Sequence, residues 1–184
     1  MNDTYSEITK LLEELRIKKK EEFNRKVPIG DLLTERHENA RKLGFGEGTT
    51  CYDNVHIIGD VKIGKHTYIG PNVYIDGTGG LEIGDYCSIG AGVQIYTHNS
   101  LMWALTLGKE PYERMPVKIG SGVYICPNTI IAMGVTIGDQ CVIGSLSLVT
   151  RSIPPRSKAW GSPARVMGTI DDYFSEKLTE PVHE

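Results

Sequence analysis

His98, in the segment YTHNS at residues 96–100, is a candidate for proton transfer. A neutral imidazole, with an ordinary pKa near 6.5, can take a proton from a weak nucleophile at neutral pH. A lone histidine is more often a surface residue or a hydrogen-bonded loop residue than a catalyst. The residue type therefore makes His98 a candidate general base, with a purely structural histidine as the alternative.

A second group is basic and lies toward the C-terminus: Arg151, Arg156, Lys158 and Arg165 fall within fifteen residues. Such cations suit the phosphates of a ligand, and guanidinium groups bind them through two parallel hydrogen bonds. The alternative is a solvated basic face, which is the usual role of such runs.

An imidazole base works best when an acceptor holds its other ring nitrogen, and Asp76, Asn99 or a backbone carbonyl could do so. Asp76 lies in the segment IDGTGG. Its structural alternative is a turn-forming aspartate.

The overall composition restricts the classes of partner. The chain has 184 residues, a formal charge of −3 and 40% hydrophobic residues, which is ordinary for one globular domain and argues against nucleic acid or a membrane surface as partner. Four cysteines without a C-x-x-C pair favour a reducing compartment. The N-terminal segment has no continuous apolar run, so we expect a cytoplasmic protein without a signal peptide.

The first fifty residues predict helices. Ile8, Leu11, Leu12 and Leu15 follow the spacing of one helix face. A second helix is expected over residues 31–43, ended by Gly44. We expect residues 1–50 to form an α-helical N-terminal cap.

From Ile57 onward large aliphatic residues recur every six positions, which is the signature of a repeat architecture. They are Ile57, Ile63, Ile69, Ile75, Leu81, then after a two-residue slip Ile83, Ile89 and Ile95, and later Ile119, Ile125, Ile131, Ile137, Ile143 and Val149. A second column of smaller residues precedes the aliphatic column by two positions: Thr67, Val73, Cys87, Val93, Val123, Thr129, Val135, Cys141 and Ser147.

Six residues per face and three faces per turn predict an all-β solenoid with eighteen-residue coils, stacked about 4.7–4.9 Å apart. Both columns should point inward, with corners at glycines such as Gly64, Gly84, Gly90 and Gly120. Ile119 should then stack on Ile137, and Ile125 on Ile143. We expect the solenoid over residues 51–155 and a C-terminal segment over residues 156–184.

The repeat is interrupted between Ile95 and Ile119. A continued register would bury Glu113, at a cost of several kcal/mol for an unpaired carboxylate, and the segment contains Pro111 and Pro116. A projecting loop over about residues 97–116 is the better prediction. Trp103 in its LMWAL stretch is a candidate wall of a binding pocket or an oligomer contact.

The hexads, the YTHNS segment, the block VKIGSGVYICPNTIIAMGVTIGDQCVIGSLSLVTRSIPP and the closing GSPARV resemble the hexapeptide-repeat acyltransferases over about residues 30–170. The similarity is greatest to the maltose, galactoside and nodulation-type O-acetyltransferases and to surface-polysaccharide acetyltransferases. This resemblance implies a left-handed parallel β-helix, a homotrimer with active sites between subunits, acetyl-CoA as co-substrate, no metal, and a sugar or saccharide acceptor.

The same resemblance implies roles for individual residues. It places the catalytic histidine at His98 and an acceptor-binding acid at Asp76. Asn99 and Trp103, which come from the residues themselves and not from the resemblance, are the other candidate acceptor-binding residues. It implies cofactor-binding residues at Tyr124, Cys126, Pro127, Ser145, Thr150, Arg151 and Arg165. Lys158, from the basic group described above, is a further cofactor-binding candidate. Three positions depart from the family pattern: Tyr124 stands where tryptophan is common, Cys126 where glycine is common, and Leu146 where glycine or asparagine is common.

Several alternatives accompany this prediction. The same fold could serve an amino-sugar N-acetyltransferase or a non-catalytic scaffold protein. Cys126 as an acyl-enzyme nucleophile is a minor alternative, because no histidine lies near it in the sequence. A zinc carbonic anhydrase would need a histidine triad, and no histidine follows His98 until His183.

Overall fold

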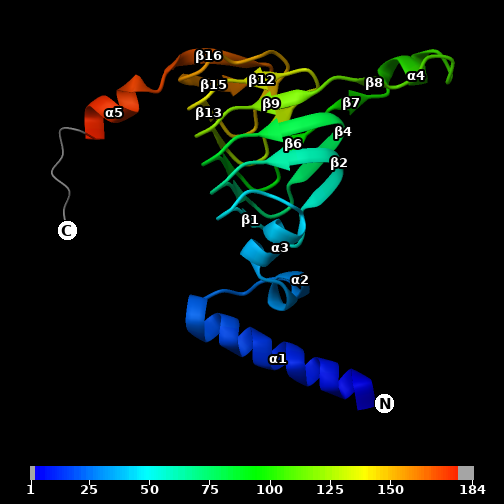
Figure 1. The fold of residues 1–184 in the computed structure, drawn as a ribbon, viewed down its shortest axis with the longest axis vertical. Helices are drawn as coiled ribbons and strands as arrows, with labels where there is room; N and C mark the ends of the chain where they lie inside the picture. The colour runs from blue at the N-terminus through cyan, green and yellow to red at the C-terminus, as the bar shows by residue number, and fades with distance from the viewer. Residues whose placement is uncertain (1–2, 178–184) are drawn as a thin grey trace.

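The computed structural model describes residues 3–177 and consists of N-terminal helices, a three-sided parallel β-solenoid and a C-terminal hairpin and helix (Figure 1). The helices are α1 (Asp3–Phe23), α2 (Ile29–Leu33) and α3 (Arg36–Lys42). Among the described residues no helix is both long enough and apolar enough to cross a membrane.

The solenoid has three faces, named here in the order in which the chain visits them. The first face contains β1 (Thr50–Cys51), β3 (Tyr68–Ile69), β5 (Ser88–Ile89), β10 (Tyr124–Ile125), β13 (Val142–Ile143) and β15 (Ser157–Gly161). The second face contains the first halves of β2 (His56–Ile63) and β4 (Tyr74–Ile83), followed by β6 (Gln94–Ile95), β11 (Ile130–Ile131) and β14 (Leu148–Val149). The third face contains the second halves of β2 and β4, with β9 (Val117–Ile119) and β12 (Thr136–Ile137).

The predicted isoleucine ladder is confirmed in its register. Ile119 pairs with Ile137, Ile125 with Ile143, and Ile131 with Val149, each eighteen residues apart. All nine residues of the smaller column are buried as well. The polar members of that column are satisfied by the neighbouring corner, since the Thr129 hydroxyl donates to the Gly144 carbonyl at 3.0 Å.

The corners turn in a different way from the sequence prediction, which placed the turn at glycines such as Gly64 and Gly90. A Cβ atom at Gly90 would lie 2.7 Å from the backbone nitrogen of Pro127, so glycine is needed there because the next coil leaves no room. The left-handed φ occurs two residues later, at Gly92 (φ 68°). Leu146 adopts this conformation (φ 58°), which explains why glycine or asparagine would suit that position.

The N-terminal helices differ from the prediction in two respects. The expected helix over residues 31–43 is broken into α2 and α3, because Thr34 and Glu35 are extended and the Glu35 carboxylate caps α3 by accepting from the Glu38 N–H at 2.9 Å. Helix α1 buries none of its residues, so the packing against the solenoid comes from α3, whose Ala40 joins the core.

The predicted interruption is a projecting segment, which leaves the solenoid at the upper right of Figure 1. Two short antiparallel strands, β7 (His98–Asn99) and β8 (Glu113–Arg114), form its stem, and the helix α4 (Leu101–Leu105) lies at its outer end. None of the α4 residues is buried. The solenoid is continuous across this excursion, since Ile89 and Ile125 pair directly on the first face.

The C-terminal segment completes the first face and then leaves it. β15 pairs with β13 in parallel, and β16 (Ala164–Thr169) pairs with β15 antiparallel, before α5 (Asp171–Lys177). The expected tail beyond residue 177 lies outside the described residues.

The cysteines allow a direct chemical test of this fold. Cys51, Cys87 and Cys141 are buried, and burial raises the pKa of each thiol, in the case of Cys51 to about 11. Cys126 is partly exposed. We expect a disulfide-exchange reagent such as Ellman's reagent to modify one thiol per native chain quickly and four after unfolding in guanidinium. Rapid modification of a second thiol in the native protein would contradict this packing.

Candidate functional site

The site begins where the solenoid coil is widened by two residues. Ile69 and Ile89 pair on the first face although they are twenty residues apart. The extra length falls between Gly77 and Leu81 of β4, where the register with β2 shifts. The next coil leaves the solenoid at Thr97 to form the projecting segment. Asp76 and His98, twenty-two residues apart, therefore meet at the corner between the second and third faces.

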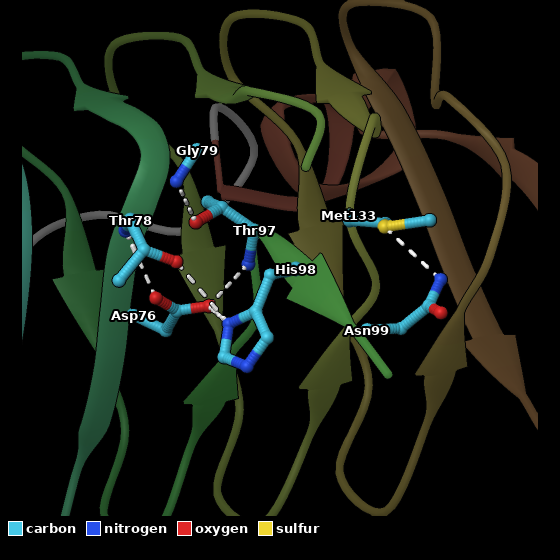
Figure 2. Close-up of polar contacts among 7 residues, drawn as sticks. All are labelled: Asp76, Thr78, Gly79, Thr97, His98, Asn99 and Met133. Atoms are coloured by element: carbon cyan, nitrogen blue, oxygen red, sulfur yellow. Dashed lines mark hydrogen bonds and ion pairs between the residues drawn. The ribbon is translucent and has the colours of Figure 1, made fainter. Parts of the chain in front are cut away.

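The two side chains form a direct hydrogen bond. The His98 Nδ1 atom lies 2.5 Å from the Asp76 Oδ2 atom, and the Thr78 hydroxyl lies 3.2 Å from the same nitrogen (Figure 2). The Asp76 side chain is 0% exposed and that of His98 is 28% exposed. A carboxylate on Nδ1 stabilises the tautomer with its proton there, so the Nε2 atom is left as the basic nitrogen.

Asp76 also fixes the backbone on both sides of the site. Its Oδ1 atom accepts from the Thr78 N–H and its Oδ2 atom from the Thr97 N–H, each at 2.9 Å. The Thr97 hydroxyl in turn accepts from the Gly79 N–H at 2.8 Å. Burial alone would raise the pKa of Asp76, but hydrogen bonds from Thr78, Thr97 and His98 outweigh it and lower the pKa to about 2. Asp76 is therefore a carboxylate at neutral pH.

These contacts bear on the two roles predicted for Asp76, acceptor binding and orientation of the imidazole. The carboxylate is fully buried and its two oxygens already accept three hydrogen bonds, two from backbone and one from His98. It has no surface with which to contact an acceptor. The structure supports the other role that the sequence suggested, which is to orient the imidazole.

Asn99 is engaged within the projecting segment. Its amide nitrogen donates to the Glu113 carboxylate at 3.0 Å and lies 3.2 Å from the Met133 sulfur. Its amide oxygen accepts from the Leu101 N–H at 2.9 Å, which satisfies a donor at the start of α4. These contacts hold the loop against the next coil, and the acceptor contact of the partly exposed Asn99 stays a prediction.

Aromatic side chains of the loop lie beside His98. The Tyr112 ring stacks on the imidazole with centroids 6.1 Å apart and planes 15° apart. The Trp103 ring meets the edge of Tyr112 at 5.6 Å. Both rings are partly exposed. The sequence analysis did not predict a role for Tyr112. This residue lies in the segment without repeats, where no pattern predicts which residues come close in the fold.

The predicted cofactor residues lie at two corners of the solenoid and on the strands of its first-face sheet. Cys126 and Pro127 follow β10, and Ser145 follows β13, so they share the corner between the first and second faces. The Leu146 N–H, beside Ser145, donates to the Pro127 carbonyl at 3.2 Å. The exposed Tyr124 lies on β10 of the first face.

Thr150 and Arg151 follow β14, at the corner between the second and third faces. This is the edge on which His98 lies, and both residues are exposed. Lys158 is on β15, in register with Val142, and its ammonium pairs with the Asp172 carboxylate at 2.5 Å. Arg165 is exposed on β16, opposite Trp160.

An open groove on the surface of the solenoid lies away from the predicted site residues. Its volume is about 660 Å³, and it runs along the third face between Lys62 and Pro155. None of the predicted site residues lines it. Among the described residues no cluster of three or more His, Cys, Asp or Glu side chains is placed to hold a metal ion.

The fold and site together define a three-sided β-helix of hexapeptide repeats with a histidine–carboxylate pair at the base of a projecting loop. The sequence matches the profile of the family described as "Bacterial transferase hexapeptide (six repeats)" over residues 45–77 and 116–151. The chain thus carries hexapeptide repeats that match this profile in two segments, and its fold is the predicted left-handed parallel β-helix.

Individual relatives agree with this classification. Galactoside O-acetyltransferase of Escherichia coli (strain K12) is 35% identical over 127 residues, covering 66% of this chain and 62% of that protein. Nodulation protein L of Rhizobium meliloti (strain 1021) is 43% identical over 115 residues, covering 59% of this chain and 60% of that protein. The chain thus spans about three fifths of the length of these curated relatives.

A solved structure extends the similarity over nearly the whole chain. The crystal structure of a hexapeptide-repeat-containing acetyltransferase from Vibrio cholerae O1 biovar eltor, complexed with acetyl coenzyme A, is 28% identical. The match covers 92% of each chain with a TM-score of 0.66.

Proposed function

We infer that the protein is an acetyl-CoA-dependent O-acetyltransferase that acts on a hydroxyl group of a sugar or saccharide. The observation that carries this proposal is the partly exposed His98 imidazole, which the buried Asp76 carboxylate holds at Nδ1 while Nε2 makes no hydrogen bond with a described residue. A galactoside O-acetyltransferase among the relatives and an acetyl-CoA complex among the similar structures support the acceptor and the donor.

In the reaction we propose, the Nε2 atom of His98 takes the proton of the acceptor hydroxyl as its oxygen attacks the acetyl carbonyl. The new C–O bond forms, the C–S bond of the thioester breaks, and the imidazolium returns its proton to the departing thiolate. Asp76 keeps the imidazole in the required tautomer and stabilises the imidazolium. Trp103, exposed beside Tyr112, is the proposed wall of the acceptor pocket.

The cofactor site in this proposal lies between subunits of a homotrimer. Cys126, Pro127 and Ser145, which are expected to contact the pantetheine arm of CoA, are at the corner between the first and second faces. His98, Thr150 and Arg151 are at the other edge of the second face. A packed core fills the solenoid between these edges. A neighbouring copy that presents one edge to the other would complete the site. The four free thiols support a reducing, cytoplasmic setting.

Cofactor binding can be tested before any acceptor is known. Calorimetric titration with acetyl-CoA should give saturable binding, and Arg151→Ala and Arg165→Ala should each weaken it by about tenfold, as expected when a charge-assisted hydrogen bond to phosphate is lost. Lys42→Ala is the matched control, because Lys42 is an exposed cation on α3 that pairs only locally with Glu38. Absence of acetyl-CoA binding in the unaltered protein would favour the non-catalytic scaffold.

The acceptor can then be identified by turnover. CoA release from acetyl-CoA should be stimulated by sugars or oligosaccharides with a free hydroxyl. A panel that includes amino sugars distinguishes the two transferase reactions, since the N-acetyl product resists mild alkali and the O-acetyl ester does not. Stimulation by amino sugars alone would replace the O-acetyltransferase proposal by the N-acetyltransferase alternative.

A further inference from the structure

The side chain of Tyr112 lies against the face of the His98 imidazole, and no other described aromatic ring does so. The ring planes differ by only 15° at a centroid separation of 6.1 Å, which is within the range of offset-stacked pairs. Asp76 and Thr78 contact the edge of the imidazole at Nδ1. Tyr112 contacts its face and therefore restrains rotation that the edge contacts alone would allow. The Nε2 atom makes no hydrogen bond with any described residue.

Tyr112 is itself held in place by the loop. It directly precedes β8, whose Glu113 and Arg114 pair with Asn99 and His98 of β7. The Trp103 ring meets Tyr112 at an interplanar angle of 88°, an edge-to-face contact. The outer part of the loop is thus connected to the imidazole through two aromatic contacts.

The geometry points to Tyr112 as a positioning residue for His98, an assignment that rests on the proposed acetyl transfer. The tyrosine ring keeps the imidazole plane in the orientation that presents Nε2 to the acceptor. When His98 takes the proton, the resulting imidazolium lies over an electron-rich ring face, which stabilises a cation. Both effects act on the chemical step more than on the binding of either substrate.

The stacking can be measured without any catalytic assay. A tyrosine ring above an imidazole shifts the imidazole ¹H resonances upfield through its ring current, and NMR spectra of selectively labelled histidine resolve these signals. Tyr112→Leu should abolish the upfield shift of the His98 signals, and Tyr112→Phe should retain it. His98→Ala assigns the signals.

A second stacked pair in the same protein supplies the control. Tyr86 stacks on His66 with centroids 4.9 Å apart and planes 23° apart, outside the site. Tyr86→Leu should move the His66 signals and leave both the His98 signals and turnover unchanged. The control therefore separates a general effect of removing an exposed tyrosine from an effect on His98.

The kinetic test uses the same variants. Tyr112→Leu should lower kcat by roughly tenfold, as expected for a misoriented catalytic group, with the KM values for acetyl-CoA and acceptor within about twofold of the unaltered protein. Tyr112→Phe should restore kcat, because the ring and not the hydroxyl makes the contact.

Three outcomes would overturn the assignment. They are unchanged His98 signals in Tyr112→Leu, a loss of kcat that Tyr112→Phe shares, and an effect confined to the KM of the acceptor, which would make Tyr112 a pocket wall. Failure of the proposed function would look different: His98→Ala would retain acetyl-transfer activity, while the unaltered protein would still show the upfield shift of its His98 signals.

Discussion

Replacing His98 by alanine should lower the turnover of acetyl transfer by roughly a hundredfold to ten-thousandfold, the usual contribution of a general base. The reason is geometric, because His98 is held through Nδ1 by the Asp76 carboxylate at 2.5 Å and has Nε2 available. The variant loses the group that takes the acceptor proton and returns it to the thiolate. Measured kcat values at saturating acetyl-CoA and acceptor provide the test.

Binding of acetyl-CoA by the His98→Ala variant should remain within about threefold of the unaltered protein, because the imidazole contributes to proton transfer and not to the phosphate contacts. His56→Ala is a suitable control, since His56 is an exposed histidine on β2 that packs beside Tyr74. It should leave turnover unchanged. A His98→Ala protein with near-normal turnover would refute the assignment of the base.

Replacing Asp76 by asparagine should have the second largest effect, with turnover lowered by roughly a hundredfold or more. The asparagine amide would donate to Nδ1, which favours the tautomer with its proton on Nε2, and that tautomer cannot act as a base. The amide nitrogen then stands in place of Oδ2, which accepts from the Thr97 N–H, so that N–H loses its acceptor.

Thr78→Val is the matched control for Asp76→Asn. It removes the hydroxyl that lies 3.2 Å from Nδ1 but keeps the Thr78 N–H that donates to Asp76. Turnover should fall by less than about fivefold, as expected for loss of one exposed hydrogen bond. Equal losses in Thr78→Val and Asp76→Asn would show that the carboxylate has no special role.

Asp76→Asn should also change how the stability of the folded protein depends on pH. The pKa of Asp76 is about 2 in the folded protein against an ordinary value of 3.8, so the folded state favours the carboxylate. Its contribution, about 2 kcal/mol, is present above pH 4 and is lost as the pH falls through 2. Urea unfolding of the unaltered protein and Asp76→Asn should therefore differ most at neutral pH and converge between pH 4 and pH 2. A difference that is independent of pH would contradict the folded-state pKa.

Much of the solenoid followed from local rules. The column of aliphatic residues every six positions predicted the pairing of Ile125 with Ile143, because the same short pattern repeats in every coil and each coil meets only its neighbours. The interruption was equally visible, because Glu113 fell on a core position. In both cases the relevant information lies within a few residues of the position concerned.

The helical segment was predicted less accurately. The apolar spacing of Ile8 to Leu15 indicated a helix correctly, but it could not show that α1 buries none of its residues. The break between α2 and α3 depends on Glu35, which caps the N-terminus of α3. In addition, the Asp31 carboxylate of α2 accepts a hydrogen bond from the Asp53 N–H at 3.2 Å. Asp31 and Asp53 are twenty-two residues apart in the sequence, and no periodic pattern of residues predicts their contact.

The sequence by itself determined that this protein is a three-sided hexapeptide solenoid, because a period of six repeated over many coils admits one packing of its aliphatic residues. It also determined that a loop containing His98 interrupts the repeat. Only the tertiary structure decided which side chains surround the imidazole. Asp76 reaches His98 because the widened coil of β4 stacks on the next one, and Tyr112 reaches it because β8 folds back on β7. These contacts join segments without a repeat, so their spacing is set by chain folding and not by a pattern in the sequence.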